Sequence, residues 1–511
     1  MRGPHNIFRL IRTGATLERT GAMSIVLEAL NAPRPLRIIA RLLCWPIKWF
    51  GLRGDDSMPP VTRALSVLGP AYIKFGQILS TRPDLVGEEL ANQLRVLQDR
   101  LPPFSIEEAK ETFFIETGLS ADETFDQFSE AIAAASIAQV HKARLRETKE
   151  ELAVKVLRPG IEKAFRRDVD AFYLLAGLVD FFAPFARRLR PVEVIEHFEG
   201  IVLSELDLRL ESSYASKFKD TTKADNGFNV PSVNWKLSAK RVMTMSWVEG
   251  IALGDIKSLE NYGHDKLALG ERVLQLFLNH ALRDGYFHAD MHQGNLKVSS
   301  EGEIIAYDFG IMGYIDEYTR RVYAEILYGF IKRDYKRVAE VHFEAGYVPM
   351  DRDVDDFANA LRAVGEPIFG MDAANISMGK LLAYLFEVTE RFGMETRTEL
   401  ILLQRTMVVV EGVARSLNPT INIWKTAQPI VENYIRQSIG PKAIVKDIAH
   451  TVRVVARFGP RLPKLVENIL LDHSKKQEKK ANSFSKLSYA SISIVSAFLG
   501  ALLASLIFNL Q

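Results

Sequence analysis

The segment that most constrains this chain is an eight-residue loop, His288 to Asn295, followed by a short strand and an Asp-Phe-Gly triplet. The loop contains Asp290, and Asp308 follows thirteen residues after Asn295. Phosphoryl transfer from Mg-ATP needs a carboxylate near the acceptor, an amide oxygen on one metal ion and a second carboxylate on the metals. We therefore predict a phosphotransferase site with Asp290 as its catalytic carboxylate and with Asn295 and Asp308 as magnesium ligands.

Two short apolar stretches are predicted to be strands that lead to this site. Residues 303–307 (EIIAY) would bring Asp308 to the end of a sheet, and residues 152–156 (LAVKV) carry Lys155 within an otherwise apolar run. A buried ammonium needs an anionic partner, whereas a lysine on an edge strand would simply be solvated. From the sequence alone, three acids on a following helix remain candidate partners of Lys155: Glu205, Asp207 and Glu211.

The segment before Lys155 differs from the glycine-rich loops that cover nucleotide phosphates in ordinary protein kinases. It contains Ala133, Ala134, Ala135, Ser136, Ile137, Ala138, Gln139, Val140 and His141. Small residues permit close backbone approach, but alanine penalises positive φ where glycine does not. We expect these nine residues to bind the nucleotide, together with Lys155, through a stiffer loop.

In combination these motifs resemble those of the UbiB (ADCK-like) family of atypical kinases, which supports ubiquinone biosynthesis. The resemblance is close over roughly residues 60–345. The matching motifs, in chain order, are Lys74-Phe-Gly76-Gln77, Ala133 to Ser136, Glu205-Leu-Asp207, and His288 to Asn295 with Asp308.

The resemblance implies an α+β, protein-kinase-like bilobal fold with a helical N-terminal extension across the active site. It implies binding of ATP and magnesium, and ATP turnover in preference to peptide phosphorylation. Lys74 would then lie near the phosphates and contact Glu205 and Asp207, with Gly76 and Gln77 beside it. In this hypothesis Glu205 joins Lys155 in holding the phosphates. Without the resemblance, residues 71–86 read only as an amphipathic helix with a lysine on it.

Further positions are assigned to the nucleotide base and to the loop. Met245, Trp247 and Val248 are expected to contact adenine, next to a Ser246 where the family commonly has an acid. His288 is expected to support the catalytic loop through hydrogen bonds. His292 has two interpretations, the same structural role or assistance at the phosphate. The pattern from His288 to Asn295, with its second histidine, favours water or a small or lipid-like acceptor over a peptide. No Ala-Pro-Glu follows the Asp-Phe-Gly triplet, so the usual platform for a peptide substrate is not visible.

The composition of the chain bears on nucleic-acid binding, disulfides and thiolate metal sites. A formal net charge of +2 over 511 residues gives no case for nucleic acid, which would need a concentrated basic face, so we expect no nucleic acid. The single cysteine, Cys44, excludes an intramolecular disulfide and a thiolate metal site.

The end of the sequence predicts a transmembrane helix. Residues 487–508 carry no charge, and at about 1.5 Å per residue they would span about 33 Å, enough to cross a hydrocarbon core of about 30 Å. The alternative is a buried core helix. The preceding lysines favour a single pass with the catalytic domain in the cytoplasm. The anchor, the lone cysteine and the lack of a clear cleavage site favour a bacterial inner membrane; a mitochondrial inner membrane is the alternative. Small residues spaced along the segment would also suit helix pairing and a homodimer.

The sequence is divided as follows: 1–60, a basic segment that is either membrane-interfacial or packed; 61–130, a helical extension with the Lys-x-Gly-Gln motif; 131–250, a kinase-like N-lobe; 251–471, a C-lobe with helical extension; 472–486, a basic linker; 487–508, the transmembrane helix. The expected partners are membrane lipid, ubiquinone precursors and ubiquinone biosynthesis enzymes. The alternative to an ATPase or kinase is a nucleotide-binding pseudokinase scaffold without turnover.

Overall fold

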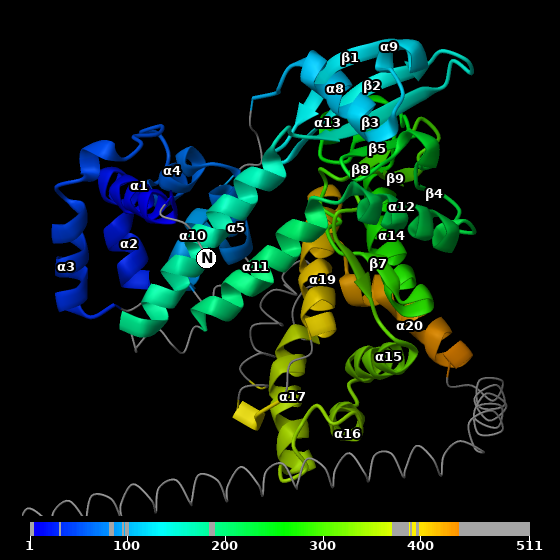
Figure 1. Ribbon diagram of the computed structural model, residues 1–511. Helices are drawn as coiled ribbons and strands as arrows, with labels where there is room; N and C mark the ends of the chain where they lie inside the picture. The colour runs from blue at the N-terminus through cyan, green and yellow to red at the C-terminus, as the bar shows by residue number, and fades with distance from the viewer. Residues whose placement is uncertain are drawn as a thin grey trace, which may run out of the picture. The chain divides into compact units, whose positions relative to one another are not determined.

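The computed structural model describes residues 5–29, 32–80, 86–94, 97, 102–182, 190–369, 388, 391–394 and 398–438 (Figure 1). The predicted linker 472–486 and the predicted transmembrane helix 487–508 lie outside these residues. Among the described residues, no helix has both the length and the apolar character needed to cross a membrane. The chain divides into two units, Met1–Val431 and Glu432–Gln511, and the elements described below belong to the first, apart from the end of the last helix.

The N-terminal part is a group of short helices joined by tight turns. Its elements are α1 His5–Thr20, α2 Ala22–Ala29, α3 Arg34–Cys44, η1 Lys48–Phe50, α4 Pro60–Leu68, α5 Pro70–Ser80 and α7 Glu88–Leu94. Prolines occupy the first turns of α3 and α4, where a missing N–H costs no helical hydrogen bond. Small residues such as Ala22 and Ala64 are fully buried, which lets these helices approach closely.

The next part is an antiparallel four-stranded sheet in the order β1-β2-β3-β5. Its strands are β1 Phe125–Ala134, β2 Ala138–Leu145, β3 Glu151–Leu157 and β5 Val242–Ser246. Helix α8 Ile106–Thr117 covers one face of the sheet, with the Phe113 ring 5.3 Å from that of Phe125. The short helix α9 Ala121–Thr124 leads into β1. Because α8 and β1 belong to this layer, the N-lobe begins before the predicted residue 131.

Three helices are inserted between β3 and β5: α10 Ile161–Phe182, α11 Pro191–Glu205 and α12 Leu208–Thr222. Helices α10 and α11 pack on each other and on α5 through an aromatic cluster. The Phe75 ring on α5 lies 5.1 Å from that of Phe172 and 5.2 Å from that of Phe198. This insertion therefore joins the N-terminal helices to the sheet.

The C-terminal part is mainly helical, and small sheets carry the predicted catalytic segment. Strands β4 Phe228–Asn229, β9 Ile304–Ala306, β8 Leu296–Val298 and β6 Ile251–Ala252 form one sheet in that order, and β7 Tyr286–His288 pairs with β10 Met312–Tyr314. The surrounding turns and helices are η3 Trp235–Leu237, α13 Ile256–Asn261, α14 Lys266–Asn279, η4 His280–Asp284, α15 Glu317–Lys332, α16 Tyr335–Glu344, α17 Val354–Phe369, α19 Thr398–Leu417 and α20 Ile423–Ser438. The strands predicted at 152–156 and 303–307 are confirmed as β3 and β9, and the α+β class is confirmed.

The buried His342 on α16 predicts a pH-dependent stability. Its Nδ1–H donates to the Val338 carbonyl at 2.7 Å, and burial lowers its pKa to about 4, against about 6.5 in an unfolded chain. Between these values the unfolded chain binds a proton that the folded chain rejects, so stability is present above pH 6.5 and falls as the pH decreases. From pH 7 to pH 5 this histidine should remove about 2 kcal/mol from the free energy of unfolding.

The measurement is urea unfolding of the wild type and His342→Phe at both pH values. The variant should lose less stability than the wild type between pH 7 and pH 5, whatever its absolute stability. Equal losses in the two proteins would assign the pH dependence to other groups.

Candidate active site

One face of the N-lobe sheet carries Lys155 among small and apolar side chains. In β3, Ala153 and Lys155 lie on the same face because side chains alternate along a strand. Residues paired directly across the strands share that face, and Lys155 pairs with Val140 of β2 and Met243 of β5. Ala153 pairs with Met245 in the same way. A small residue, apolar neighbours and one lysine thus line the side of the sheet opposite α8.

Lys155 is the centre of a buried ion-pair cluster. Its Nζ lies 2.7 and 2.9 Å from the carboxylate oxygens of Glu211 and 3.5 Å from Asp308 Oδ2. Burial alone would lower the pKa of Lys155, but the charges of Asp308 and Glu211 outweigh it and raise the pKa. Burial raises the pKa of Glu211, which Lys155 opposes. The ammonium therefore stays charged and links the sheet, α12 and the Asp-Phe-Gly triplet.

The structure assigns different tasks to the three candidate acids. Glu211 lies one turn into α12 and is the partner of Lys155, which corrects the hypothesis that Glu205 has this role. Glu205, the last residue of α11, pairs with Lys74 at 2.8 Å. Asp207 caps α12 by accepting from the Arg209 backbone N–H at 3.1 Å. The hydrogen bonds from Arg209 lower the pKa of Asp207, so its charge is committed to this cap.

The Lys-x-Gly-Gln motif is placed by close packing of α5. A Cβ on Gly76 would meet Leu97 Cδ1 at 2.4 Å and Leu65 Cδ1 at 2.6 Å, so any larger residue here would require both leucine side chains to shift. The Gln77 amide donates to the Leu97 carbonyl at 3.4 Å. Gly76 therefore sets how closely α5 approaches its neighbours, and Lys74 reaches Glu205 from that position.

His288 joins the catalytic loop to the Asp-Phe-Gly triplet. It is fully buried, its Nε2–H donates to the Asp308 carbonyl at 2.5 Å, and its Nδ1 accepts from the Asp290 backbone N–H at 3.1 Å. These bonds require the neutral ring with its proton on Nε2, and burial lowers the pKa of His288 in agreement. The expected supporting role of His288 fits this geometry.

Asn295 and Asp290 are held next to each other. The Asn295 Nδ2 donates to the Asp290 carbonyl at 3.0 Å and to Asp290 Oδ2 at 3.3 Å. This orientation leaves the Asn295 Oδ1 as an acceptor. An amide oxygen and the Asp308 carboxylate are hard oxygen ligands of the kind magnesium prefers, so the donor set fits the predicted metal.

His292 is half-exposed and lies at the same loop. Its Nδ1 accepts from the Gly294 N–H at 2.9 Å, and its Nε2 is 3.7 Å from Asp290 Oδ2. The first contact stabilises the turn, and the second directs the free ring nitrogen towards Asp290. Both interpretations of His292 therefore remain compatible with its position.

Phe309 secures the Asp-Phe-Gly triplet in the core. Its ring is fully buried, 6.2 Å from that of Phe218 on α12 and 5.8 Å from that of His288. The Phe309 N–H also points at Glu211 Oε1, at 3.5 Å. Burial of Phe309 thus fixes Asp308 and Glu211 on the two sides of Lys155.

The alanine-rich loop is a tight turn between β1 and β2. The Ala135 N–H donates to the Ala138 carbonyl at 2.8 Å. Arg158, which the sequence analysis missed, donates through Nε and a terminal nitrogen to the Ala135 carbonyl at 3.2 and 3.1 Å. Its backbone N–H binds the Ile137 carbonyl at 2.9 Å. The loop is therefore restrained by hydrogen bonds as well as by its alanines.

The assignment of the Gln139 and His141 side chains to the nucleotide needs correction. Both are buried on the other face of β2, because they alternate with Val140. Gln139 exchanges hydrogen bonds with the backbone of Phe104 at 3.0 and 3.2 Å, and His141 donates to the Ser129 carbonyl at 2.9 Å. They hold the sheet together, and only their backbone faces the loop.

The expected adenine segment follows β5 and includes an unpredicted lysine. The Trp247 N–H donates to the Glu151 carbonyl at 2.9 Å. Lys297 on β8 donates to the Val248 carbonyl at 3.2 Å, and its Nζ lies 5.1 Å from the Trp247 ring centroid. Lys297 follows the predicted magnesium ligand Asn295 by only two residues, and this short spacing is the signal by which the sequence could have indicated that Lys297 lies at the site.

Helix α19 also contributes to the site, which no motif indicated. The Thr406 hydroxyl lies 3.1 Å from the Ala289 carbonyl and 2.8 Å from the Leu402 carbonyl of its own helix, so its one proton is shared between these two acceptors. The neighbouring Arg405 senses the charge of Asp290, which opposes the lowering of its pKa by burial. These contacts join residues more than a hundred positions apart, and a single sequence carries no local signal for them.

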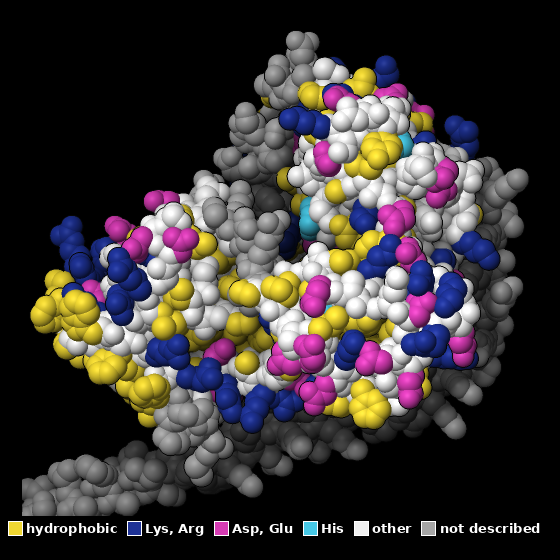
Figure 2. Space-filling model, turned by 90° about the horizontal axis from the view of Figure 1, so that it is seen from above, with side chains coloured by type: hydrophobic (Ala, Val, Ile, Leu, Met, Phe, Trp, Pro, Cys, Tyr) yellow, Lys and Arg dark blue, Asp and Glu magenta, His cyan; other side chains and the backbone are white. Residues whose placement is uncertain are grey.

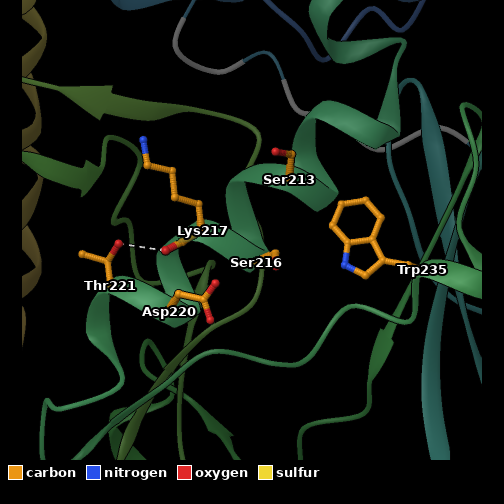
Figure 3. A pocket seen from close by; sticks show the side chains of 6 residues that line it. All are labelled: Ser213, Ser216, Lys217, Asp220, Thr221 and Trp235. Carbon is orange, nitrogen blue, oxygen red and sulfur yellow. Dashed lines mark hydrogen bonds between the residues drawn. The ribbon is translucent and has the colours of Figure 1, made fainter.

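Two further features of the described residues lie apart from this site. An open pocket on α12, shown in Figure 3, is lined by Ser213, Ser216, Lys217, Asp220, Thr221 and Trp235. The helical spacing of these residues places them on the side of α12 away from Glu211. A cluster of Asp225, His280 and Asp284 has metal-ligand character, but Arg283 forms ion pairs with both carboxylates, as in a structural cluster.

Comparisons with known proteins agree with this geometry. Residues 96–342 match the ABC1 atypical kinase-like domain, and residues 361–422 match the UbiB helical domain, which includes the Arg405 and Thr406 positions. The chain is 40% identical over 472 residues to an Aeromonas hydrophila protein named probable protein kinase UbiB, covering 91% of this chain and 86% of that protein. A Marinobacter nauticus protein of the same name is 38% identical over 446 residues, covering 86% and 81% of the two chains.

A solved structure supports the kinase-like fold. It is a Mycobacterium tuberculosis protein in complex with erythromycin, similar with a TM-score of 0.50 and 24% identity. The match covers 70% of this chain and 90% of that chain. The kinase-like α+β fold expected from the sequence is therefore confirmed.

The division of labour between the acids predicts different effects of two matched substitutions. Glu211→Gln removes the closest anionic partner of buried Lys155 and should weaken Mg-ATP binding about tenfold. Glu205→Gln leaves the Lys155 pair in place and should change affinity by no more than about twofold. Titration with a fluorescent ATP analogue measures both. A larger loss for Glu205→Gln would restore Glu205 as the residue at the phosphates.

The contact from α19 predicts that Thr406 restrains the catalytic loop. Thr406→Val removes the hydrogen bond to the Ala289 carbonyl, whereas Thr406→Ser keeps a donor there. Loss of one such bond costs about 1 kcal/mol, so amide hydrogen exchange in residues 289–295 should be roughly fivefold faster in the valine variant. Unchanged exchange, or equal acceleration in the serine variant, would show that this bond does not hold the loop.

Proposed function

This chain belongs to the UbiB family of ABC1-type atypical kinases, and we propose that it binds Mg-ATP and turns it over in support of ubiquinone biosynthesis. The observation that carries the proposal is the Lys155 cluster, because it places a charged ammonium between the α12 carboxylate and the Asp-Phe-Gly carboxylate. Such an arrangement favours binding of nucleotide phosphates beside a metal site.

The proposed roles follow from the positions of the groups. Lys155, held by Glu211, contacts the phosphates, and Asn295 and Asp308 hold magnesium, which neutralises charge on the phosphates when bound. Asp290 orients the attacking group. Its backbone is fixed by His288 and Asn295, so its part-exposed carboxylate keeps a constant direction.

The proposed acceptor is water or a small or lipid-like molecule. Helix α5 is tied through Lys74 to the end of α11, directly before the helix that carries Glu211. The N-terminal helical extension, which includes α5, is therefore anchored beside the nucleotide site. The family resemblance implies that it blocks peptides from binding there. The chain's lack of an Ala-Pro-Glu platform is consistent with this acceptor class.

The cellular setting is also part of the proposal. The curated relatives are bacterial and carry the name probable protein kinase UbiB, which supports a role at the bacterial inner membrane. Residues 487–508 would anchor the chain with its kinase-like domain in the cytoplasm. Its partners would be membrane lipid, ubiquinone precursors and the enzymes that modify them, and the anchor would allow a homodimer.

A nucleotide-binding scaffold without turnover is the second candidate. The restrained alanine-rich loop favours it, since a loop held by Arg158 has less freedom to close over the phosphates. Asp290 opposes it, because a scaffold has no need of a carboxylate at the acceptor position.

Phosphate release by the full-length chain in phospholipid vesicles separates these functions. With magnesium and ATP we expect turnover in the wild type, and a loss of about a hundredfold or more in Asp308→Asn and in Asp290→Asn. Asp290→Asn should still bind nucleotide, since its carboxylate acts on the acceptor. Asp220→Asn, on the solvent side of α12, is the matched control and should keep full activity. No release from the wild type, with nucleotide binding intact, would reject turnover and favour the scaffold.

A further inference from the structure

The helix α3 and the turn after it expose an unusual number of large apolar side chains. Seven of them are more than half exposed, and together they are called the N-terminal apolar face: Ile38, Ile39, Leu42, Leu43, Trp45, Trp49 and Phe50. Figure 2 shows hydrophobic side chains gathered over the N-terminal helices, with Lys and Arg side chains beside them. Exposed apolar side chains gathered in this way mark an interaction surface.

The spacing of these residues places several of them on one side of the helix. Ile38, Leu42 and Trp45 recur at intervals of four and three residues, which places them along one stripe of α3 and its C-cap, and Trp49 follows in η1. A different side of α3 contacts α1 through Cys44, whose Sγ would lie 3.2 Å from a Cβ on Gly14. The helix thus packs on α1 through one side and presents the apolar face on another.

The segment that carries the face has charges of one sign only. Residues 29–54 contain no aspartate or glutamate, and they contain Arg34, Arg37, Arg41, Lys48 and Arg53. The three arginines of α3 recur at three and four residues and follow one edge of the apolar stripe. Arg37 reaches the exposed Glu28 only at 3.6 Å, and the exposed Arg41 reaches the largely buried Glu18 only at 3.7 Å. The Arg37 pair is a loose surface pair and therefore weak, and the Arg41 guanidinium stays open to solvent, so both cations can meet an anionic partner.

The aromatic residues stand beside the cations in the manner of a membrane interface. The Lys48 Nζ lies 5.6 Å from the Trp45 ring centroid and 5.1 Å from that of Trp49. Tryptophan and lysine are favoured together at the level of lipid headgroups. At about 1.5 Å per residue α3 is only about 16 Å long, too short to cross a bilayer and long enough to lie in its surface.

We propose that the N-terminal apolar face docks on the surface of a bilayer that contains anionic phospholipid. The apolar side chains enter the headgroup–acyl boundary, and the arginines and Lys48 bind lipid phosphates. Within the same helical group, Thr13 on α1 and Tyr72 on α5 join through their hydroxyls, which are 2.7 Å apart, and Tyr72 lies on α5 close to Lys74. A lipid surface would thus be bound by the same part of the chain that supplies the Lys-x-Gly-Gln motif.

This inference rests on the proposed membrane location but not on the anchor that residues 487–508 would supply. The test uses the full-length chain in vesicles of phosphatidylcholine with about 30 mol% phosphatidylglycerol, in which the acyl chains carry bromine. Bromine quenches tryptophan only at contact range. Tryptophan emission should be quenched in the wild type, and the quenched share should be lost in Trp45→Phe/Trp49→Phe. Trp235→Phe, which removes an exposed tryptophan elsewhere, is the matched control and should keep that share.

The charge contribution is tested with Arg34→Gln/Arg37→Gln/Arg41→Gln in the same vesicles. At about fivefold per cation, the variant should lower the equilibrium constant for docking of the face by about a hundredfold. Vesicles without phosphatidylglycerol should have a similar effect on the wild type.

Protein that floats with the vesicles while Trp45 and Trp49 stay unquenched would overturn the proposal and leave both the anchor and ATP turnover untouched. Unquenched tryptophans together with a dimer that Leu42→Ser/Trp49→Ser dissociates would overturn it in favour of a second copy of this chain. The loss of phosphate release alone bears on the proposed function and leaves docking unaffected.

Discussion

The site depends on one buried lysine held between two carboxylates. Lys155 belongs to the sheet, Glu211 to an inserted helix and Asp308 to the catalytic segment, and their ion pairs fasten these three parts together. Lys155 and Glu211 are mostly buried, so either charge without the other would be costly. Asp308, whose side chain is 42% exposed, adds a second anion beside the ammonium. The cluster therefore determines where α12 and the Asp-Phe-Gly triplet lie, and it keeps a positive charge ready for phosphates.

The second link in this arrangement is the short connection from α11 to α12. Within seven residues, Glu205 binds the extension, Asp207 starts the new helix and Glu211 binds Lys155. A displacement of α5 would move Glu205 and, through the cap at Asp207, the helix that carries Glu211. Because Glu205, Asp207 and Glu211 are so close in the chain, a lipid surface bound by the N-terminal helices would have a physical route to the nucleotide site.

Several parts of the site were predictable because their signals are local. The strands at 152–156 and 303–307, the loop around Asp290 and the need for a carboxylate near Lys155 all follow from spacing and residue type. The side-chain roles of Gln139 and His141 were missed because the motif was taken as a block, although alternation along β2 turns them to the α8 face. Arg158, Lys297, Arg405 and Thr406 were missed because their contacts join distant segments.

The sequence by itself determined the reaction class and its core residues, since phosphate and magnesium chemistry demands particular groups at a fixed spacing. It also determined that α3 would be basic and apolar at once. Only the tertiary structure decided which acid meets Lys155, because Glu205 and Glu211 are chemically alike and differ in the helix from which they project, α11 or α12. It likewise decided that the α3 face is exposed, since burial of an apolar residue depends on what packs against it from elsewhere in the chain.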